Sequence, residues 1–128
     1  MPEEQKKILI VEDAVPLARA LREALEGVGF IVAVAGDGEH GLELARSEKP
    51  NLILLDILLP KKDGLWLLKE LRTTDEGKKI PVMMLTNLSD TKNVNTALQY
   101  GAYDYMVKSD WKINDIVESI QKKLYHTV

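Results

Sequence analysis

Residues 52–56 read Leu-Ile-Leu-Leu-Asp, an apolar run that ends on the carboxylate of Asp56. The stretch 8–13 repeats the pattern, because Ile-Leu-Ile-Val is followed by Glu12 and Asp13. Burying an unpaired carboxylate is costly, so two apolar strands that end on carboxylates need a common reason. If the strands are neighbours in a parallel sheet, their carboxyl ends meet at the edge where open α/β sheets bind ligands. The two stretches therefore predict an acidic site centred on Asp56.

Short apolar runs alternate with helical patterns along the whole chain. The apolar runs predict strands at 8–12, 30–35, 52–56, 82–86 and 102–108. The helical patterns predict helices at 15–28, from a cap at Asp37 through 46, from 65 through 71, from a cap at Ser89 or Asp90 to Tyr100, and at 111–125. Near-continuous apolar strands separated by helices indicate a parallel sheet covered on both faces. The sequence thus predicts one doubly wound α/β domain, 1–128, with its core at about 7–125.

The composition excludes several classes of protein. The chain has 128 residues, 45% hydrophobic and 29% charged, with a net charge of -3, so it has no basic footprint for nucleic acid. It has no cysteine, which excludes disulfides, thiolate catalysis and cysteine-based zinc sites. The charged N-terminus and the short apolar runs predict neither a signal peptide nor a membrane span, and a cytoplasmic location is expected.

Two further strand ends carry groups that suit phosphoryl chemistry. Thr86 and Lys108 end the fourth and fifth predicted strands and so share an edge with the carboxylates. A cluster of carboxylate oxygens favours a hard cation such as Mg²⁺, Mn²⁺ or Ca²⁺, and His40 and His126 fall outside it. A carboxylate nucleophile, a metal ion, an ammonium and a hydroxyl are the parts that phosphoryl transfer needs.

Five segments in this order resemble the receiver domain of a two-component response regulator, of the stand-alone chemotaxis-Y type. These segments are 8–13, 52–56, the loop 59–64, 82–86 and 101–108, and they are spread over most of the length of the chain. The resemblance implies a flavodoxin-like, five-stranded parallel sheet with strand order 2-1-3-4-5 and helices on both faces.

The resemblance implies that Asp56 is the phosphoacceptor, which takes a phosphoryl group from a sensor histidine kinase or a histidine phosphotransfer domain. Asp13 would hold Mg²⁺, or Mn²⁺ in its place, together with Asp56 and the backbone carbonyl of Leu58. Glu12 would act mostly through a bound water. The domain would be a signalling phosphoacceptor that assists its own phosphorylation and dephosphorylation, not an enzyme with a separate substrate.

The remaining positions of the resemblance concern switching. Lys108 would pair with the phosphoryl group, Thr86 would reorient to hydrogen-bond it, and Tyr105 would be the aromatic switch residue that turns inward behind the threonine. The output surface would be the fourth helix, fifth strand and fifth helix, with parts of 93–100, 103–105 and 111–112. The expected state is a monomer or a weak dimer formed on phosphorylation, with no effector domain, no bound nucleic acid and an effector protein that the sequence does not name.

Three rival functions stay open. A phosphatase or phosphotransferase with an aspartyl intermediate would need a substrate pocket or cap domain, and no insertion is long enough to supply one. A pseudo-receiver would be an interaction module with an inert site, and the intact set of Asp13, Asp56, Thr86 and Lys108 argues against it. A flavodoxin-like cofactor-binding protein ranks last, because the acidic loop 12–16 lacks the glycines that cradle phosphate.

The chain departs from the family pattern around the site. Ser109 stands where the family usually has proline, so we predict a trans bond after Lys108, and Ser109 and Asp110 are predicted to cap the last helix. Asn87 replaces a small residue, and Leu58 and Leu88 occupy flanking positions that are often polar. Because apolar side chains cannot orient an attacking water, the hypothesis is a long-lived phospho-Asp56.

Overall fold

The computed structural model describes residues 5–86 and 91–125. Its centre is one five-stranded sheet with the order β2-β1-β3-β4-β5, in which every neighbouring pair is parallel. The strands are β1 (Lys7–Val11), β2 (Ile31–Ala35), β3 (Leu52–Leu55), β4 (Val82–Thr86) and β5 (Asp104–Val107). The doubly wound α/β fold and the strand order that we expected are confirmed.

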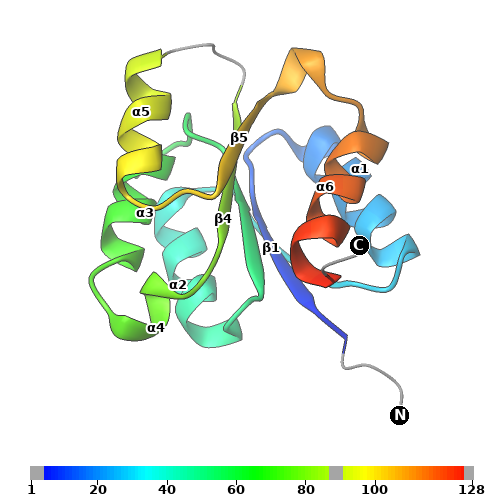
Figure 1. The fold of residues 1–128 in the computed structure, drawn as a ribbon, viewed down its shortest axis with the longest axis horizontal. Helices are drawn as coiled ribbons and strands as arrows, with labels where there is room; N and C mark the ends of the chain where they lie inside the picture. The colour runs from blue at the N-terminus through cyan, green and yellow to red at the C-terminus, as the bar shows by residue number, and fades with distance from the viewer. Residues whose placement is uncertain (1–4, 87–90, 126–128) are drawn as a thin grey trace.

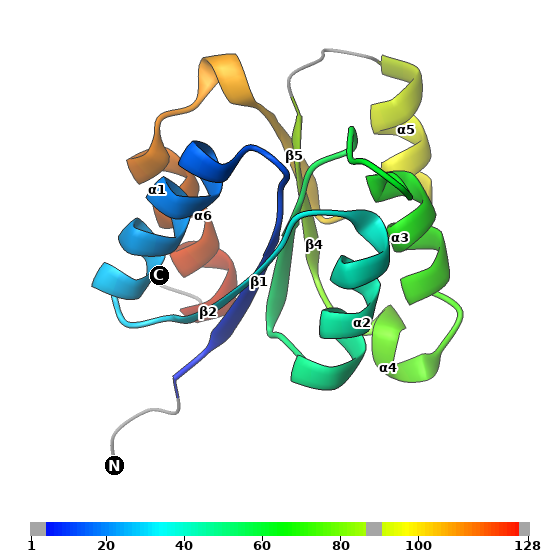
Figure 2. The ribbon, with the colours of Figure 1, turned by 180° about the vertical axis from the view of Figure 1, so that it is seen from behind.

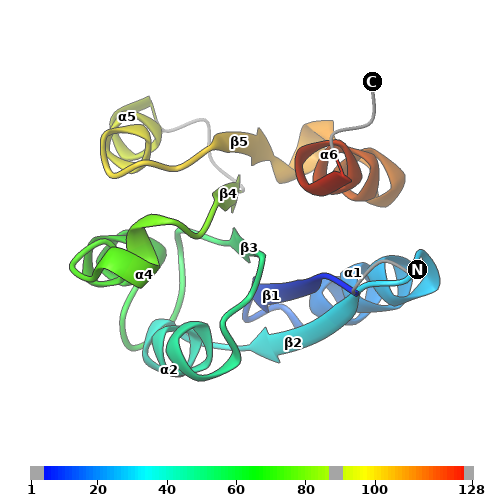
Figure 3. The same cartoon turned by 60° about the horizontal axis from the view of Figure 1, so that its bottom comes forward.

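Two layers of helices cover the sheet. The helices are α1 (Val15–Gly27), α2 (Gly38–Glu48), α3 (Gly64–Leu71), α4 (Asp75–Lys78), α5 (Thr91–Gln99) and α6 (Ile113–Tyr125), with a short 3-10 helix η1 (Lys108–Asp110). α1 and α6 lie on one face, and α2, α3, α4 and α5 lie on the other (Figures 1 and 2). Figure 3 shows the sheet between these two layers. Within the described part of the chain, no helix is both long enough and apolar enough to cross a membrane.

Alternation along the strands divides the core into two parts. Leu9 and Val11 of β1 belong to the cluster on the α2 and α3 side, whereas Ile8 and Ile10 belong to the cluster on the α1 and α6 side. All four side chains are fully buried, because successive side chains of a strand point to opposite faces and both faces are covered. This double burial explains why the strands read as continuous apolar runs.

Helix caps follow the sequence where it offers side-chain acceptors. The side chain of Asp37 accepts a hydrogen bond from the His40 N–H at 2.8 Å and starts α2, as predicted. Asp63 caps α3 in the same way through the Trp66 N–H at 2.9 Å. The predicted caps Ser89 and Asp90 lie outside the described residues.

The C-terminal third differs from the sequence prediction. Ser109 and Asp110 do not cap the last helix: they belong to η1, and α6 begins only at Ile113. The backbone N–H of Lys112, the residue before α6, donates to the carboxylate of Asp115 in the first turn of this helix at 3.1 Å. The extended backbone of Trp111, with φ -120° and ψ 134°, separates the two helices. β5 is also shorter than the predicted strand 102–108.

The short helix α4 was not predicted. Thr74 caps it by accepting from the Gly77 N–H at 3.0 Å. Gly77 packs so tightly that a Cβ atom there would lie 1.8 Å from the Leu71 carbonyl oxygen. Four residues are too few for a helical hydrophobic pattern, so this turn depends on its cap and on close backbone packing.

Candidate functional site

Three carboxylates meet at the carboxyl edge of the sheet. Glu12 and Asp13 follow β1, Asp56 follows β3, and the register pairs the last residues of these strands, Val11 and Leu55. One oxygen atom from each carboxylate lies within 4.8 Å of the other two. Glu12 and Asp56 are each only 4% exposed, whereas Asp13 faces solvent. The cluster predicted from the two strand ends therefore exists, and one of its members is open to an incoming ligand.

Lys108, the first residue of η1, reaches this cluster from just beyond the end of β5. Its Nζ atom lies 3.0 Å from Oδ2 of Asp56 and also forms an ion pair with Oε1 of Glu12. Only 12% of the lysine side chain is exposed. A charged pair with this burial is held more firmly than a surface pair, because little water screens it. The ammonium is therefore positioned at the carboxylate that the sequence singled out.

Burial and charge pairing shift the pKa values of Glu12 and Lys108. Burial raises the pKa of Glu12, and this effect outweighs the hydrogen bonds from Lys108 and from the Ala14 N–H. Burial by itself would lower the pKa of Lys108, but hydrogen bonds and charge attraction from Glu12 and Asp56 outweigh it and the pKa is raised. One ammonium thus neutralises two buried carboxylates only in part. The remaining negative charge favours binding of a second cation at this edge.

The donor set fits a hard divalent cation. Its three carboxylates supply only oxygen, as Mg²⁺ and Mn²⁺ prefer. Oε1 of Glu12 is buried, and its polar contact among the described residues is the ion pair with Lys108, so this oxygen keeps a lone pair for a further ligand. His40 is exposed on α2 and lies outside this cluster, as predicted.

The loop after β3 turns tightly around Asp56. Oδ1 of Asp56 accepts from the Leu58 N–H at 3.3 Å, and the Gly64 N–H donates to the Ile57 carbonyl at 2.8 Å. A Cβ atom on Gly64 would lie 2.1 Å from the backbone oxygen of Asp56, so glycine is needed there. The start of α3 therefore rests directly on the backbone of Asp56. The Leu58 carbonyl as a metal ligand stays a prediction.

Thr86 and Tyr105 lie on the two strands beyond Asp56. Thr86 ends β4, is 1% exposed, and pairs in register with Val107, the residue before Lys108. Tyr105 is 42% exposed and lines a cavity between β5 and α5. The threonine is thus placed at the site edge, and the tyrosine lies on the outer surface next to α5.

The structure describes two of the positions that depart from the family pattern, the bond from Lys108 to Ser109 and the side chain of Leu58. No cis peptide bond occurs in the described residues, so the bond from Lys108 to Ser109 is trans, as predicted. The side chain of Leu58 is exposed beside the site. Asn87 and Leu88 lie outside the described residues, so the hypothesis of a long-lived phosphoryl group stays a prediction.

Sequence reasoning missed two polar contacts that involve the functional elements. It assigned Lys108 to a phosphoryl group, but did not foresee its ion pair with Glu12. It also gave no role to Arg72, whose guanidinium donates to four backbone carbonyls. The sequence pattern does not show which polar groups of different elements come together, so neither the ion pair of Lys108 with Glu12 nor the hydrogen bonds of Arg72 could be found from it.

A parallel sheet in this order, with three carboxylates and a lysine at its carboxyl edge, is typical of signalling domains that accept a phosphoryl group on an aspartate. Residues 8–121 match the family model described as the response regulator receiver domain. The chain therefore belongs to the response regulator receiver family.

Known proteins of this family resemble the chain along most of its length. The alkaline phosphatase synthesis transcriptional regulatory protein PhoP of Bacillus subtilis is 39% identical over 120 residues, which are 92% of this chain and 49% of PhoP. The Mn²⁺-bound response regulator Rcp1 has a TM-score of 0.83 at 30% identity, and the match covers 96% of both chains. The phosphorylated cyanobacterial phytochrome response regulator RcpA has a TM-score of 0.84 at 30% identity, and the match covers 98% of this chain and 97% of RcpA. The chain spans about half the length of the curated relatives that it matches.

Proposed function

We propose that Asp56 accepts a phosphoryl group from a sensor histidine kinase or a histidine phosphotransfer domain, and that this switches a surface for protein–protein signalling. Phosphotransfer from a kinase is the role of the family to which the chain belongs. The observation that supports the residue assignment is the contact of 3.0 Å between Lys108 Nζ and Oδ2 of Asp56, inside a cluster of three carboxylates.

Each side chain has a defined task in this proposal. A carboxylate oxygen of Asp56 attacks the phosphorus atom, and the bond from phosphorus to the donor's imidazole nitrogen breaks. Lys108, already at Asp56, neutralises charge on a phosphoryl oxygen, and Thr86 donates a hydrogen bond to another. Asp13, Asp56 and the Leu58 carbonyl would hold Mg²⁺ or Mn²⁺, with Glu12 acting mostly through a bound water. The ion would supply positive charge beside the transferring group. Rcp1 in its Mn²⁺-bound form and RcpA in its phosphorylated form share this fold, which supports both the metal and the phosphoryl group.

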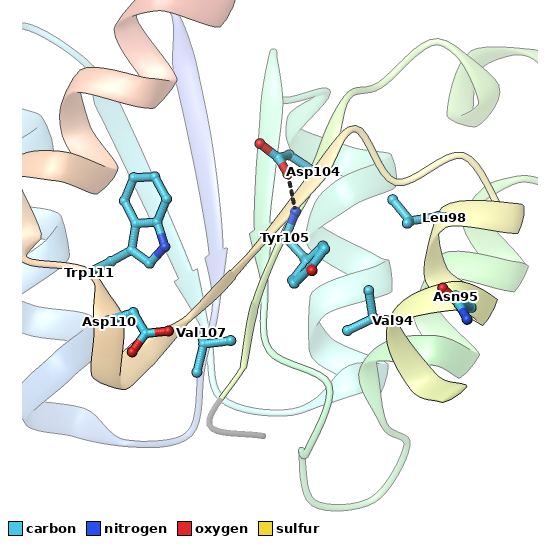
Figure 4. A pocket seen from close by; sticks show the side chains of 8 residues that line it. All are labelled: Val94, Asn95, Leu98, Asp104, Tyr105, Val107, Asp110 and Trp111. Atoms are coloured by element: carbon cyan, nitrogen blue, oxygen red, sulfur yellow. Dashed lines mark hydrogen bonds between the residues drawn. The ribbon is translucent and has the colours of Figure 1, made fainter. Parts of the chain in front are cut away.

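The output surface that we propose consists of α5, β5 and α6, the fourth helix, fifth strand and fifth helix of the family pattern. A cavity of about 610 Å³ lies on it, lined by Val94, Asn95, Leu98, Asp104, Tyr105, Val107, Asp110 and Trp111. In Figure 4, Tyr105 extends from β5 toward Val94 of α5, and Trp111 lies on the other side of β5. Exposed aromatic side chains beside a hollow are typical of a protein-binding surface.

We propose that residues 1–128 act as one signalling unit and not as an enzyme with a separate substrate. The curated relatives include regulators named as DNA-binding, so an effector domain or an effector protein would receive the signal.

The test is phosphorylation by acetyl phosphate and Mg²⁺, read by intact mass. The wild-type chain should gain one phosphoryl group, and Asp56→Asn should gain none. Asp63→Asn is the matched control, because Asp63 is exposed, caps α3, and can be replaced by another good capping residue. If neither acetyl phosphate nor a histidine kinase modifies the wild type, the chain is an interaction module with an inert site.

A further inference from the structure

Arg72 connects three segments of the chain that are separate in sequence. It follows the last residue of α3, and its guanidinium donates to the carbonyls of Gly77 at 2.5 Å, Ile80 at 2.8 Å, Tyr100 at 2.9 Å and Gly101 at 3.0 Å. The first two carbonyls belong to α4 and the approach to β4, and the other two lie just after α5. Burial lowers the pKa of Arg72, but an arginine stays charged at any physiological pH. Its hydrogen bonds therefore remain charge-assisted and strong.

The two contacts with Tyr100 and Gly101 fix the C-terminal end of α5. Gly101 adopts φ +83°, and a Cβ atom there would lie 3.2 Å from the arginine Nε atom, so the chain reverses closely around the guanidinium. Lys69, also on α3, places its ammonium 5.3 Å from the centre of the Tyr100 ring. Two cations of α3 and its C-terminal cap thus hold the same end of α5.

The rest of α5 buries few of its described side chains. Among the side chains described in this helix, residues 93–99, only Val94 and Ala97 are buried. The N-terminal end of α5 follows Thr86 in the sequence after four residues, so this end is the one next to the phosphorylation site. A helix that is fixed at one end and buries only a few side chains along the rest of its length can rotate about its fixed end.

α3 connects the site at Asp56 to the C-terminal end of α5. Its first residue, Gly64, rests on the backbone oxygen of Asp56, and Leu67 and Leu68 are fully buried. The helix is therefore a rigid connection from the backbone of Asp56 to Arg72.

We propose that Arg72 is a positioning residue for signalling, because its guanidinium fixes the C-terminal end of α5 and so confines movement of this helix to the end that follows Thr86. This inference rests on the proposed function, in which phosphorylation of Asp56 switches the surface of α5, β5 and α6. Without Arg72, the C-terminal end of α5 keeps only the contact between Lys69 and Tyr100, so less of the change at the site is transmitted to β5 and Trp111.

The experiment compares Arg72→Met, Arg72→Lys and the control Arg22→Met, all made in a Trp66→Phe background so that Trp111 is the only tryptophan. Arg22 is exposed and, within the described residues, pairs with Glu26 four residues away, so its variant removes the same charge without touching α5. Three measurements are made at a temperature where all variants are folded: the phosphoryl adduct by intact mass, the Trp111 fluorescence change on adding fluoroberyllate, and backbone amide exchange.

Arg72→Met should form the phosphoryl adduct as the parent does, exchange its amides at Tyr100 and Ala102 about tenfold faster, and lose more than about half of the Trp111 response. Arg72→Lys should recover only part of it, since one ammonium cannot reach four carbonyls as a planar guanidinium does. A full Trp111 response together with faster exchange would overturn the inference, because Arg72 would then only stabilise the loop. If Arg72→Met does not fold, Gly101→Ala replaces it as a milder displacement of the same contact, with the same expected results.

Failure of the proposed function gives a different pattern from failure of this inference. If Asp56 is not the acceptor, the parent protein itself shows no adduct and no Trp111 response to fluoroberyllate. If only the role of Arg72 is wrong, the parent responds and Arg72→Met responds equally.

Discussion

Replacing Lys108 by methionine removes the ammonium that neutralises the acidic cluster. Its Nζ atom pairs with Glu12 and Asp56, and the exposed fractions of the three side chains are 12%, 3% and 5%. Breaking a buried ion pair by removing one partner costs about 3–5 kcal/mol, because the other charge stays buried without compensation. Since the lysine keeps some contact with solvent, we expect the free energy of unfolding to fall by about 3 kcal/mol at neutral pH without metal.

The size of this loss should depend on pH, because burial already raises the pKa of Glu12. A carboxyl with a raised pKa stabilises the folded state below the ordinary value of 4.5, and this stabilisation is lost as the pH rises through the folded pKa. Removing Lys108 raises the folded pKa further, since its hydrogen bond is the strongest effect that lowers it. The variant should therefore lose less stability at about pH 5 than at about pH 8.

Urea unfolding followed by circular dichroism, with EDTA present, measures these free energies for the wild type and the variant. Lys112→Met is the control, because Lys112 is exposed just before α6 and its side chain has no ion pair among the described residues. The reasoning is refuted if the loss is below about 1 kcal/mol, the value of a surface pair, or if it is equal at the two pH values.

Two further substitutions test the backbone and the metal site. Gly64→Ala should lower the free energy of unfolding by about 2 kcal/mol or more, because its Cβ would lie 2.1 Å from the Asp56 carbonyl oxygen, whereas Gly27→Ala, with open space around it in α1, should raise it by about 0.5 kcal/mol in the same urea titration. Adding Mg²⁺ should raise the melting temperature of the wild type, and Asp13→Asn should weaken this effect. An unchanged Mg²⁺ dependence in that variant would remove Asp13 from the set of metal ligands.

The sequence carried enough information for the fold and for the centre of the site. Apolar strands alternate with helical patterns, and this alternation leaves few topologies other than a doubly wound sheet. Glu12, Asp13, Asp56 and Lys108 could be predicted to meet because parallel strands share one carboxyl edge. Strand direction, which the pattern of the chain specifies, places them on one edge, whereas the order of the strands was expected from the resemblance to the receiver family.

The tertiary structure decided which groups are paired and which elements are coupled. Lys108 bridges Asp56 and Glu12 because β5 lies beyond β4 and the lysine that follows β5 reaches back across the strand ends, a distance that no sequence spacing gives. Arg72 became a link between α3, α4 and the end of α5 only through folding, which brought four carbonyls from distant segments around one guanidinium. Sequence patterns report burial and local geometry, whereas contacts between polar groups on different elements depend on how those elements pack.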